Sequence, residues 1–347
     1  MLADELDYVI GVDPHRDSHA LAVVRAPNGQ VVIETNADAT SGGYRSILGF
    51  AEQNAPGRRA FAIEGTGSYG KGLARFLAEQ GERVIEVSRI KRDGRSTGKT
   101  DALDAVQAAR SVLARAKQAE PRSGGKREAL RALTVARAGA LAAKRAGLCQ
   151  LRDLLVTCPE PLRGELRHLT RTRLLQRLQA LRPTRHHDPE LRGTLLAMRA
   201  VARRVHHLTI EERELKHEIE TLVTELAPKL LAEPGVGPVS AAQVLISWSH
   251  PGRVPTEAAF ARLAGSAPIP ASSGQTIRYR LDRGGDRQLN RALHTIITIR
   301  RSNHAPTRAY IDRRTSEGKT TREAVRCLKR YLARHLYRLL QGAPIAT

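Results

Sequence analysis

The first 113 residues alternate short apolar runs with helical spacing, and this order restricts the fold more than any other feature of the sequence. Three strands are followed by helix, strand, helix, strand and helix. Because the later strands are joined through helices, part of the sheet should be parallel. The expected strands lie at 8–13, 19–24, 30–35, 59–64 and 83–87, and the expected helices at 43–53, 70–80 and 101–113. The order predicts an RNase-H-like α/β domain over residues 1–120.

The remainder of the chain is composed largely of helix formers. Residues 121–230 carry a stripe of leucines in two arms, separated by a proline-containing, arginine-rich stretch. This pattern fits a coiled-coil hairpin that would serve oligomerisation, and it fits a plain helical linker equally well. Glycine, proline and serine become frequent after residue 231, and helical spacing returns at 258–263, 287–302 and 322–340. We expect a mostly helical C-terminal domain at 231–347, and so an α/β plus α chain.

The chain is strongly basic, with 57 Lys and Arg against 35 Asp and Glu, a net charge of +22. The first hundred residues are neutral, whereas residues 101–200 carry +11 and residues 251–347 carry +13. Such an excess is typical of proteins that bind DNA or RNA, and no small acidic metabolite requires it. Three cysteines without zinc-ligand spacing, an acidic start and the lack of a long apolar run predict a cytoplasmic protein with no membrane contact.

Four acidic residues of the neutral domain are candidates for a metal site. Asp13 and Glu64 each end an apolar strand, and Asp101 and Asp104 are three residues apart on one helix face. Converging carboxylates repel one another unless cations lie between them, and Mg²⁺ or Mn²⁺ prefers such oxygen ligands. Two such ions can catalyse phosphodiester cleavage.

Each of these acids taken alone is also typical of a turn or a helix cap. Asp17 and Glu86 are rival acids, but the first lies in an expected turn and the second in the middle of an expected strand. We therefore favour the set of four over either rival.

The C-terminal domain contains two candidate contacts with nucleic acid. Gly235 and Gly237, in the stretch Pro-Gly-Val-Gly-Pro, resemble the hairpin of a helix-hairpin-helix motif, which binds backbone phosphates, although an ordinary turn has the same composition. The stretch Ser272-Ser273-Gly274 precedes a group of arginines that suit a phosphodiester, and a serine there is a candidate nucleophile for phosphorus, although this too is a common turn. The arginines are Arg278, Arg280, Arg283, Arg287 and Arg291.

In combination these stretches resemble the insertion-sequence 110 family of transposases, the DEDD transposases, and the related Piv-type DNA invertases. The resemblance covers both ends of the chain in order, while the helical middle is similar only in character. The matching stretches are Ile10–Asp13, Ile63–Tyr69, Lys99–Ala105, Pro234–Ala241, Leu263–Pro268, Ser272–Gly274 and Gly285–Leu293.

This resemblance implies a RuvC-like N-terminal domain, a coiled coil and a C-terminal transposase domain. The family's metal-binding tetrad falls on Asp13, Glu64, Asp101 and Asp104, and its nucleophilic serine on Ser273, with Ser272 as the adjacent alternative. It further implies recombination of DNA ends and a target, a structured guide RNA, and a homo-oligomer, either a dimer or a tetramer. The chain departs from the family pattern in two respects. Arg16 stands where a lysine is expected, and the stretch of 168 residues between Asp104 and Ser273 is longer than expected.

Other activities also fit the sequence. A RuvC-like metal-dependent endonuclease or junction resolvase would use the acids alone, and a non-catalytic protein would use only the basic charge. Strand cutting, a covalent protein–DNA adduct and dependence on a divalent cation distinguish the three. A phosphotransferase fits poorly, since the glycine loops that bind nucleotides are not found in the sequence.

Overall fold

The computed structural model describes residues 2–87, 100–113, 121, 124–181, 188–275, 279–282 and 284–341. The chain divides into two compact units. The first comprises residues 1–123 together with 248–260, and the second comprises residues 124–247 together with 261–347.

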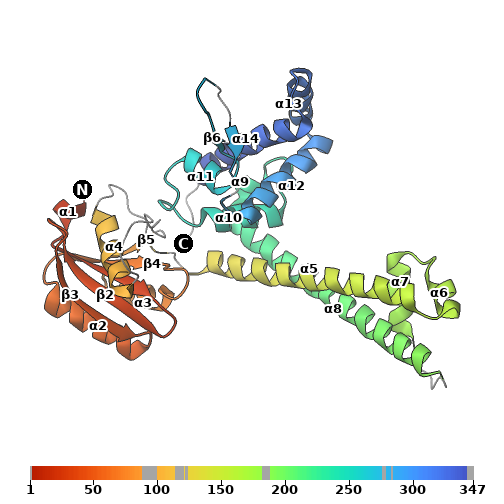
Figure 1. Cartoon of the computed structure of the whole chain (residues 1–347), viewed down its shortest axis with the longest axis horizontal. Coiled ribbons are helices and arrows are strands. Elements are labelled where there is room, and N and C mark those ends of the chain that lie inside the picture. The colour runs from red at the N-terminus through yellow and green to blue at the C-terminus, as the bar shows by residue number, and fades with distance from the viewer. Residues whose placement is uncertain are drawn as a thin grey trace. The chain divides into compact units, whose positions relative to one another are not determined.

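The first unit is built on a five-stranded mixed sheet with the order β3-β2-β1-β4-β5 (Figure 1). The first three strands pair antiparallel, whereas β4 runs parallel to both β1 and β5. This confirms the predicted order of strands and helices. The elements are α1 (Leu2–Glu5), β1 (Tyr8–Pro14), β2 (Ser18–Arg25), β3 (Val31–Asp38), α2 (Ser41–Asn54), β4 (Arg59–Glu64), α3 (Lys71–Glu79), β5 (Val84–Val87) and α4 (Asp101–Leu113).

The two faces of the sheet have separate cores because side chains alternate along each strand. Val12 and Ile63 belong to the core that α2 and α3 cover. Their neighbours on the opposite face, Val9 and Ala62, pack with Ala109 and other small residues of α4. The alternation therefore decides which strand residues meet α4.

The second unit begins with a hairpin of two long helices, α5 (Lys126–Thr157) and α8 (Pro189–Leu226), which lie side by side (Figure 1). Gly147 of α5 faces Val205 of α8 so closely that a Cβ on the glycine would lie 2.8 Å from the valine side chain. Two shorter helices occupy the proline-containing stretch, α6 (Glu160–Leu166) and α7 (Arg171–Ala180), and they share an apolar cluster with both long helices.

The rest of the second unit is mostly helical, as predicted, with a two-stranded sheet that the sequence analysis did not anticipate. Helices α12, α13 and α14 pack against one another. The antiparallel strands β6 and β7 flank the stretch that contains Ser272 and Ser273. The elements that follow α8 are α9 (Pro228–Leu231), α10 (Pro238–Trp248), α11 (Glu257–Leu263), β6 (Pro268–Pro270), β7 (Tyr279–Leu281), α12 (Arg287–Asn303), α13 (Ala305–Ser316) and α14 (Thr321–Gln341). The last residue of α10 and the first four of α11 belong to the first unit.

None of the helices in the described ranges combines the length and the apolar character needed to cross a bilayer.

Candidate metal centre and serine loop

Two of the predicted acids lie at the ends of neighbouring parallel strands. The register of β1 and β4 pairs Val12 with Ile63, so Asp13 and Glu64 stand one residue further along. Because Val12 and Ile63 face α2 and α3, alternation turns Asp13 and Glu64 toward the face covered by α4. Strand ends of this kind are where open α/β sheets bind ligands.

Helix α4 brings the other two acids to the same face. Its residues Ala105 and Ala109 are buried against the sheet, and Asp101 lies one turn before Ala105. Asp101 and Asp104 both belong to the first turn, where the helix dipole stabilises negative charge. Asp101 is exposed and Asp104 is half-buried.

The side chains of Asp13 and Asp101 converge on a third residue, His15. The Nε2 atom of His15 lies 3.4 Å from Oδ2 of Asp13 and 3.2 Å from Oδ2 of Asp101. The three ligand atoms all lie within 4.8 Å of one another. Asp13 is the most enclosed of the three, with 16% of its side chain exposed, against 44% for His15 and 55% for Asp101.

This donor set fits a divalent cation. The Nε2 atom of His15 is shielded from solvent and makes no hydrogen bond to the described residues, although two carboxylate oxygens are close to it. The two carboxylates repel each other, and a divalent cation that both of them ligate, together with the imidazole nitrogen, would offset that repulsion. Carboxylates suit Mg²⁺ and Mn²⁺, and imidazole is accepted by the transition metal more readily.

Glu64 and Asp104 are not part of this close trio, although the strand register and α4 place them on the same face. The structure therefore brings together Asp13 and Asp101 of the predicted four and adds His15. His15 has no predicted role in the sequence. The available signal was its position two residues after the strand-terminal Asp13, in the turn that leads to β2.

The rival acids have other partners. Asp17 forms a side-chain ion pair with Arg16, its exposed neighbour, at 2.7 Å. Glu86 is largely buried, and its Oε2 atom lies 3.6 Å from Nε2 of His250.

The serine loop, defined as Ser272, Ser273 and Gly274, is exposed and follows β6. Gly274 has a φ of +57°, which favours glycine and turns the chain toward β7. Arg280 in β7, and Arg287 and Arg291 in α12, are exposed. Two other predicted arginines, Arg278 and Arg283, lie outside the described residues.

Gly235 has a packing role that the sequence did not reveal. Its φ is +75°, and a Cβ there would lie 3.0 Å from both the Cγ atom of Arg300 and the carbonyl oxygen of Ile296. Arg300 also donates from Nε to the carbonyl oxygen of Pro234 at 2.6 Å, which holds the segment on α12. At Gly237 a Cβ would meet no atom within 4 Å. A phosphate contact at these glycines stays a prediction.

Comparisons with known proteins match both halves of the chain. A family model described as transposase, of the IS110 DEDD type, matches residues 10–159, and one described as the IS116/IS110/IS902 transposase family matches residues 227–312. The chain belongs to the IS110 family of transposases. The DEDD match contains all four acids and His15, and it implies the use of a divalent metal ion. The second match contains the serine loop.

A curated relative of this IS110 family member is the "Insertion element IS110 uncharacterized 43.6 kDa protein" of Streptomyces coelicolor. It is 34% identical over 134 residues. The aligned stretch spans 38% of the present chain and 33% of the relative, about a third of each protein.

Proposed function

We propose that the chain is a DNA transposase that cuts and rejoins DNA with a divalent metal held by its acidic residues and with a serine nucleophile. The observation that carries the proposal is the convergence of Asp13, His15 and Asp101 at the end of a parallel strand in an IS110 family member. The sheet has the order β3-β2-β1-β4-β5, with antiparallel pairs on one side of β1 and parallel pairs on the other, and α4 covers the acidic face. This arrangement supports an RNase-H/RuvC-like domain.

In this proposal the acidic residues of the first unit hold the metal. Strand β1 fixes the backbone position of Asp13 and the first turn of α4 fixes that of Asp101, so both carboxylates reach a cation from regular elements. Glu64 and Asp104 complete the oxygen ligands from the same face. When bound, Mg²⁺ or Mn²⁺ supplies a Lewis acid that offsets the negative charge of the phosphate in the transition state.

Ser273 supplies the proposed covalent step. Its Oγ atom forms a bond to phosphorus as the bond from phosphorus to a sugar oxygen breaks, and the hydroxyl proton is transferred to that departing oxygen. A sugar hydroxyl from a second strand reverses these steps, which releases the serine and joins the strands. Exposed Arg280, Arg287 and Arg291 are the described arginines suited to bind the DNA backbone. Ser272 is the alternative nucleophile.

A structured guide RNA and a homo-oligomer complete the proposal. The support is the net charge of +22 and the long α5–α8 hairpin, which would pair as a coiled coil with another copy. Sequencing the nucleic acid that co-purifies with the protein tests the first point, since one discrete RNA is expected and random host RNA contradicts it. Mass photometry tests the second, because a dimer or tetramer is expected and a monomer contradicts it.

The central experiment is a recombination assay with Mg²⁺, on DNA that carries the joined ends of the element encoding this chain and on a target duplex. Asp13→Asn and Ser273→Ala should each abolish recombination. Asp17→Asn should not, since Asp17 is an exposed acid of the neighbouring turn that pairs with Arg16. Full activity of both Asp13→Asn and Ser273→Ala would refute the mechanism.

The denatured products decide among the related activities. Protein covalently joined to DNA is expected for the wild type and lost in Ser273→Ala, or in Ser272→Ala if that serine attacks instead. Metal-dependent cutting that survives both serine changes without an adduct would indicate a junction resolvase. Binding with a steep salt dependence and no cutting would indicate a non-catalytic nucleic-acid-binding protein.

A further inference from the structure

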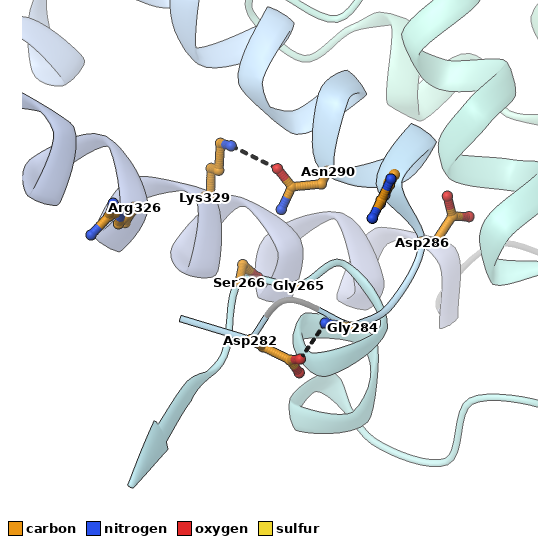
Figure 2. Close-up of a pocket in the computed structure, with 9 residues that line it drawn as sticks. Gly265, Ser266, Asp282, Gly284, Asp286, Asn290, Arg326 and Lys329 are labelled. Atoms are coloured by element: carbon orange, nitrogen blue, oxygen red, sulfur yellow. Dashed lines mark hydrogen bonds between the residues drawn. The ribbon is translucent and has the colours of Figure 1, made fainter. Parts of the chain in front are cut away.

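The second unit contains a cavity of about 280 Å³ between the loop before α12 and helix α14 (Figure 2). Three cationic side chains line it: Arg287 at the start of α12, and Arg326 and Lys329 on α14. Its size suits a small group rather than a large ligand. We propose that this cavity binds one phosphodiester group of a nucleic-acid strand. This proposal rests on the proposed function only in identifying the ligand as a nucleic acid.

Lys329 is the lining residue that most directly supports anion binding. Its ammonium group donates to Oδ1 of Asn290 at 2.9 Å, and no carboxylate among the described residues pairs with it. Figure 2 shows the side chain turned toward Asn290. An ammonium carries three donors, so two remain for a ligand. Burial, and next the nearby Arg326, lower the pKa of Lys329, because both make its positive charge less favourable. A bound anion would offset this unfavourable free energy.

The position of Lys329 is set by Asn290. The amide nitrogen of Asn290 donates to the carbonyl oxygen of Ala264 at 2.6 Å, which directs its amide oxygen at Lys329. Gly265 has a φ of +61°, and a Cβ on it would lie 3.4 Å from that same amide nitrogen. The lysine is therefore held by a side chain that is itself fixed, which is the property of a preorganised site.

Two carboxylates also line the cavity, and both are engaged by neutral donors. Asp286 caps α12 by accepting from the backbone nitrogens of Gln288 and Leu289, and its other oxygen accepts from the hydroxyl of Ser247. Asp282 accepts from the backbone nitrogen of Gly284 at 2.9 Å (Figure 2). Neither forms an ion pair with the three cations in the described part of the chain, so the cations remain available to a phosphate.

The cavity adjoins the base of the β6–β7 hairpin. Ser266, which lines the cavity, precedes β6, and Asp282 follows β7. The serine loop follows β6 at the other end of the same hairpin. A strand anchored at Lys329 would therefore lie in the unit that carries the proposed nucleophile.

The test uses the full chain in EDTA, so that no metal-dependent chemistry occurs. Short single-stranded DNA and RNA of one sequence are titrated, with inorganic phosphate as a separate arm. Lys329→Gln should weaken oligonucleotide binding about tenfold and reduce the slope of log K against log salt by about 1. Lys329→Arg should restore most of the binding. Arg330→Gln, next on α14 but outside the cavity lining, should leave the slope unchanged.

The proposal is overturned if Lys329→Gln binds both oligonucleotides as Arg330→Gln does. It is also overturned if inorganic phosphate alone binds at this residue and the oligonucleotides do not. If Lys329→Gln does not fold, the exposed Arg326→Gln serves in its place, with the same expected loss. If Lys329→Gln does not weaken oligonucleotide binding but Asp13→Asn still abolishes recombination, the cavity proposal is wrong and the proposed function is unaffected. Lysine-dependent binding without any strand transfer would support the cavity and contradict the function.

Discussion

A Cβ atom on Gly11 would lie 1.9 Å from the carbonyl oxygen of Ala105, so α4 crosses β1 at a distance that only glycine permits. Asp13 follows Gly11 by two residues on the same face, and Asp101 precedes Ala105 by one helical turn. The close crossing is therefore what brings these two carboxylates to a common point.

Replacing Gly11 with alanine should destabilise the first unit and separate the acids. The methyl group must displace backbone rather than a flexible side chain, and overpacking of this kind costs about 1–3 kcal/mol or more. Urea unfolding followed by circular dichroism measures the loss. Gly49→Ala in α2 is the matched control, because a Cβ there meets nothing within 4 Å and alanine favours the helix by about 1 kcal/mol. Equal stability of the two variants would contradict the crossing.

His15 should ligate Mn²⁺ directly. Its Nε2 atom lies within 3.4 Å of oxygens from Asp13 and Asp101, so the three atoms can share one ion. Electron spin-echo measurements on the Mn²⁺-loaded protein should show coupling to an imidazole nitrogen that His15→Ala removes, together with an affinity loss of about tenfold or more. His168→Ala, an exposed histidine of the second unit, should change neither quantity. A nitrogen signal that persists in His15→Ala would refute the ligand assignment.

His19 should make folding stability depend on pH. Its ring is fully buried against Tyr44, both ring nitrogens lack hydrogen-bond partners in the described structure, and burial lowers its pKa. Below about pH 6.5 the unfolded chain binds a proton that the folded chain does not, so stability falls as the pH falls toward the lower folded-state pKa. The slope is at most about 1.4 kcal/mol per pH unit for one proton.

Denaturation at a series of pH values measures this slope, which His19→Phe should reduce. It should not vanish, because burial, Lys329 and Arg301 also lower the pKa of His294, and His294→Gln should remove that further part. An unchanged slope in His19→Phe would show that this histidine is not neutral in the folded protein.

Arg137 and Glu212 should couple the two long helices. They form an ion pair between α5 and α8 with only 16% and 15% of their side chains exposed. Removing one partner of such a pair leaves the other charge buried without a counter-ion, so Arg137→Met should lower the free energy of unfolding by about 2–4 kcal/mol. A double-mutant cycle should give a coupling energy above about 1 kcal/mol. The pair Lys126–Glu225 joins the same helices but is about half exposed, so its coupling should stay below about 1 kcal/mol. Equal couplings would contradict this helix pairing.

The strands that end in Asp13 and Glu64 were predictable because apolar runs and their ends are local properties of the sequence. The spacing of Asp101 and Asp104 on one helix face was predictable for the same reason. The strands β6 and β7 were not, since each has only three residues and is formed by pairing across the serine loop. The packing of Gly235 against Arg300 was not predictable, because the sequence does not distinguish a glycine needed for close packing from one needed in a turn or at a phosphate.

The sequence alone determined the order of strands and helices, the basic charge and the family resemblance, because each depends on composition or on short-range spacing. Only the tertiary structure decided that His15 joins Asp13 and Asp101, and that Lys329 lies beside Asn290 with no ion-paired carboxylate among the described residues. His15 and Asp101 are 86 positions apart, and their meeting depends on how α4 crosses Gly11. Contacts at such separation are set by the packing of whole elements, and local patterns carry no information about that distance.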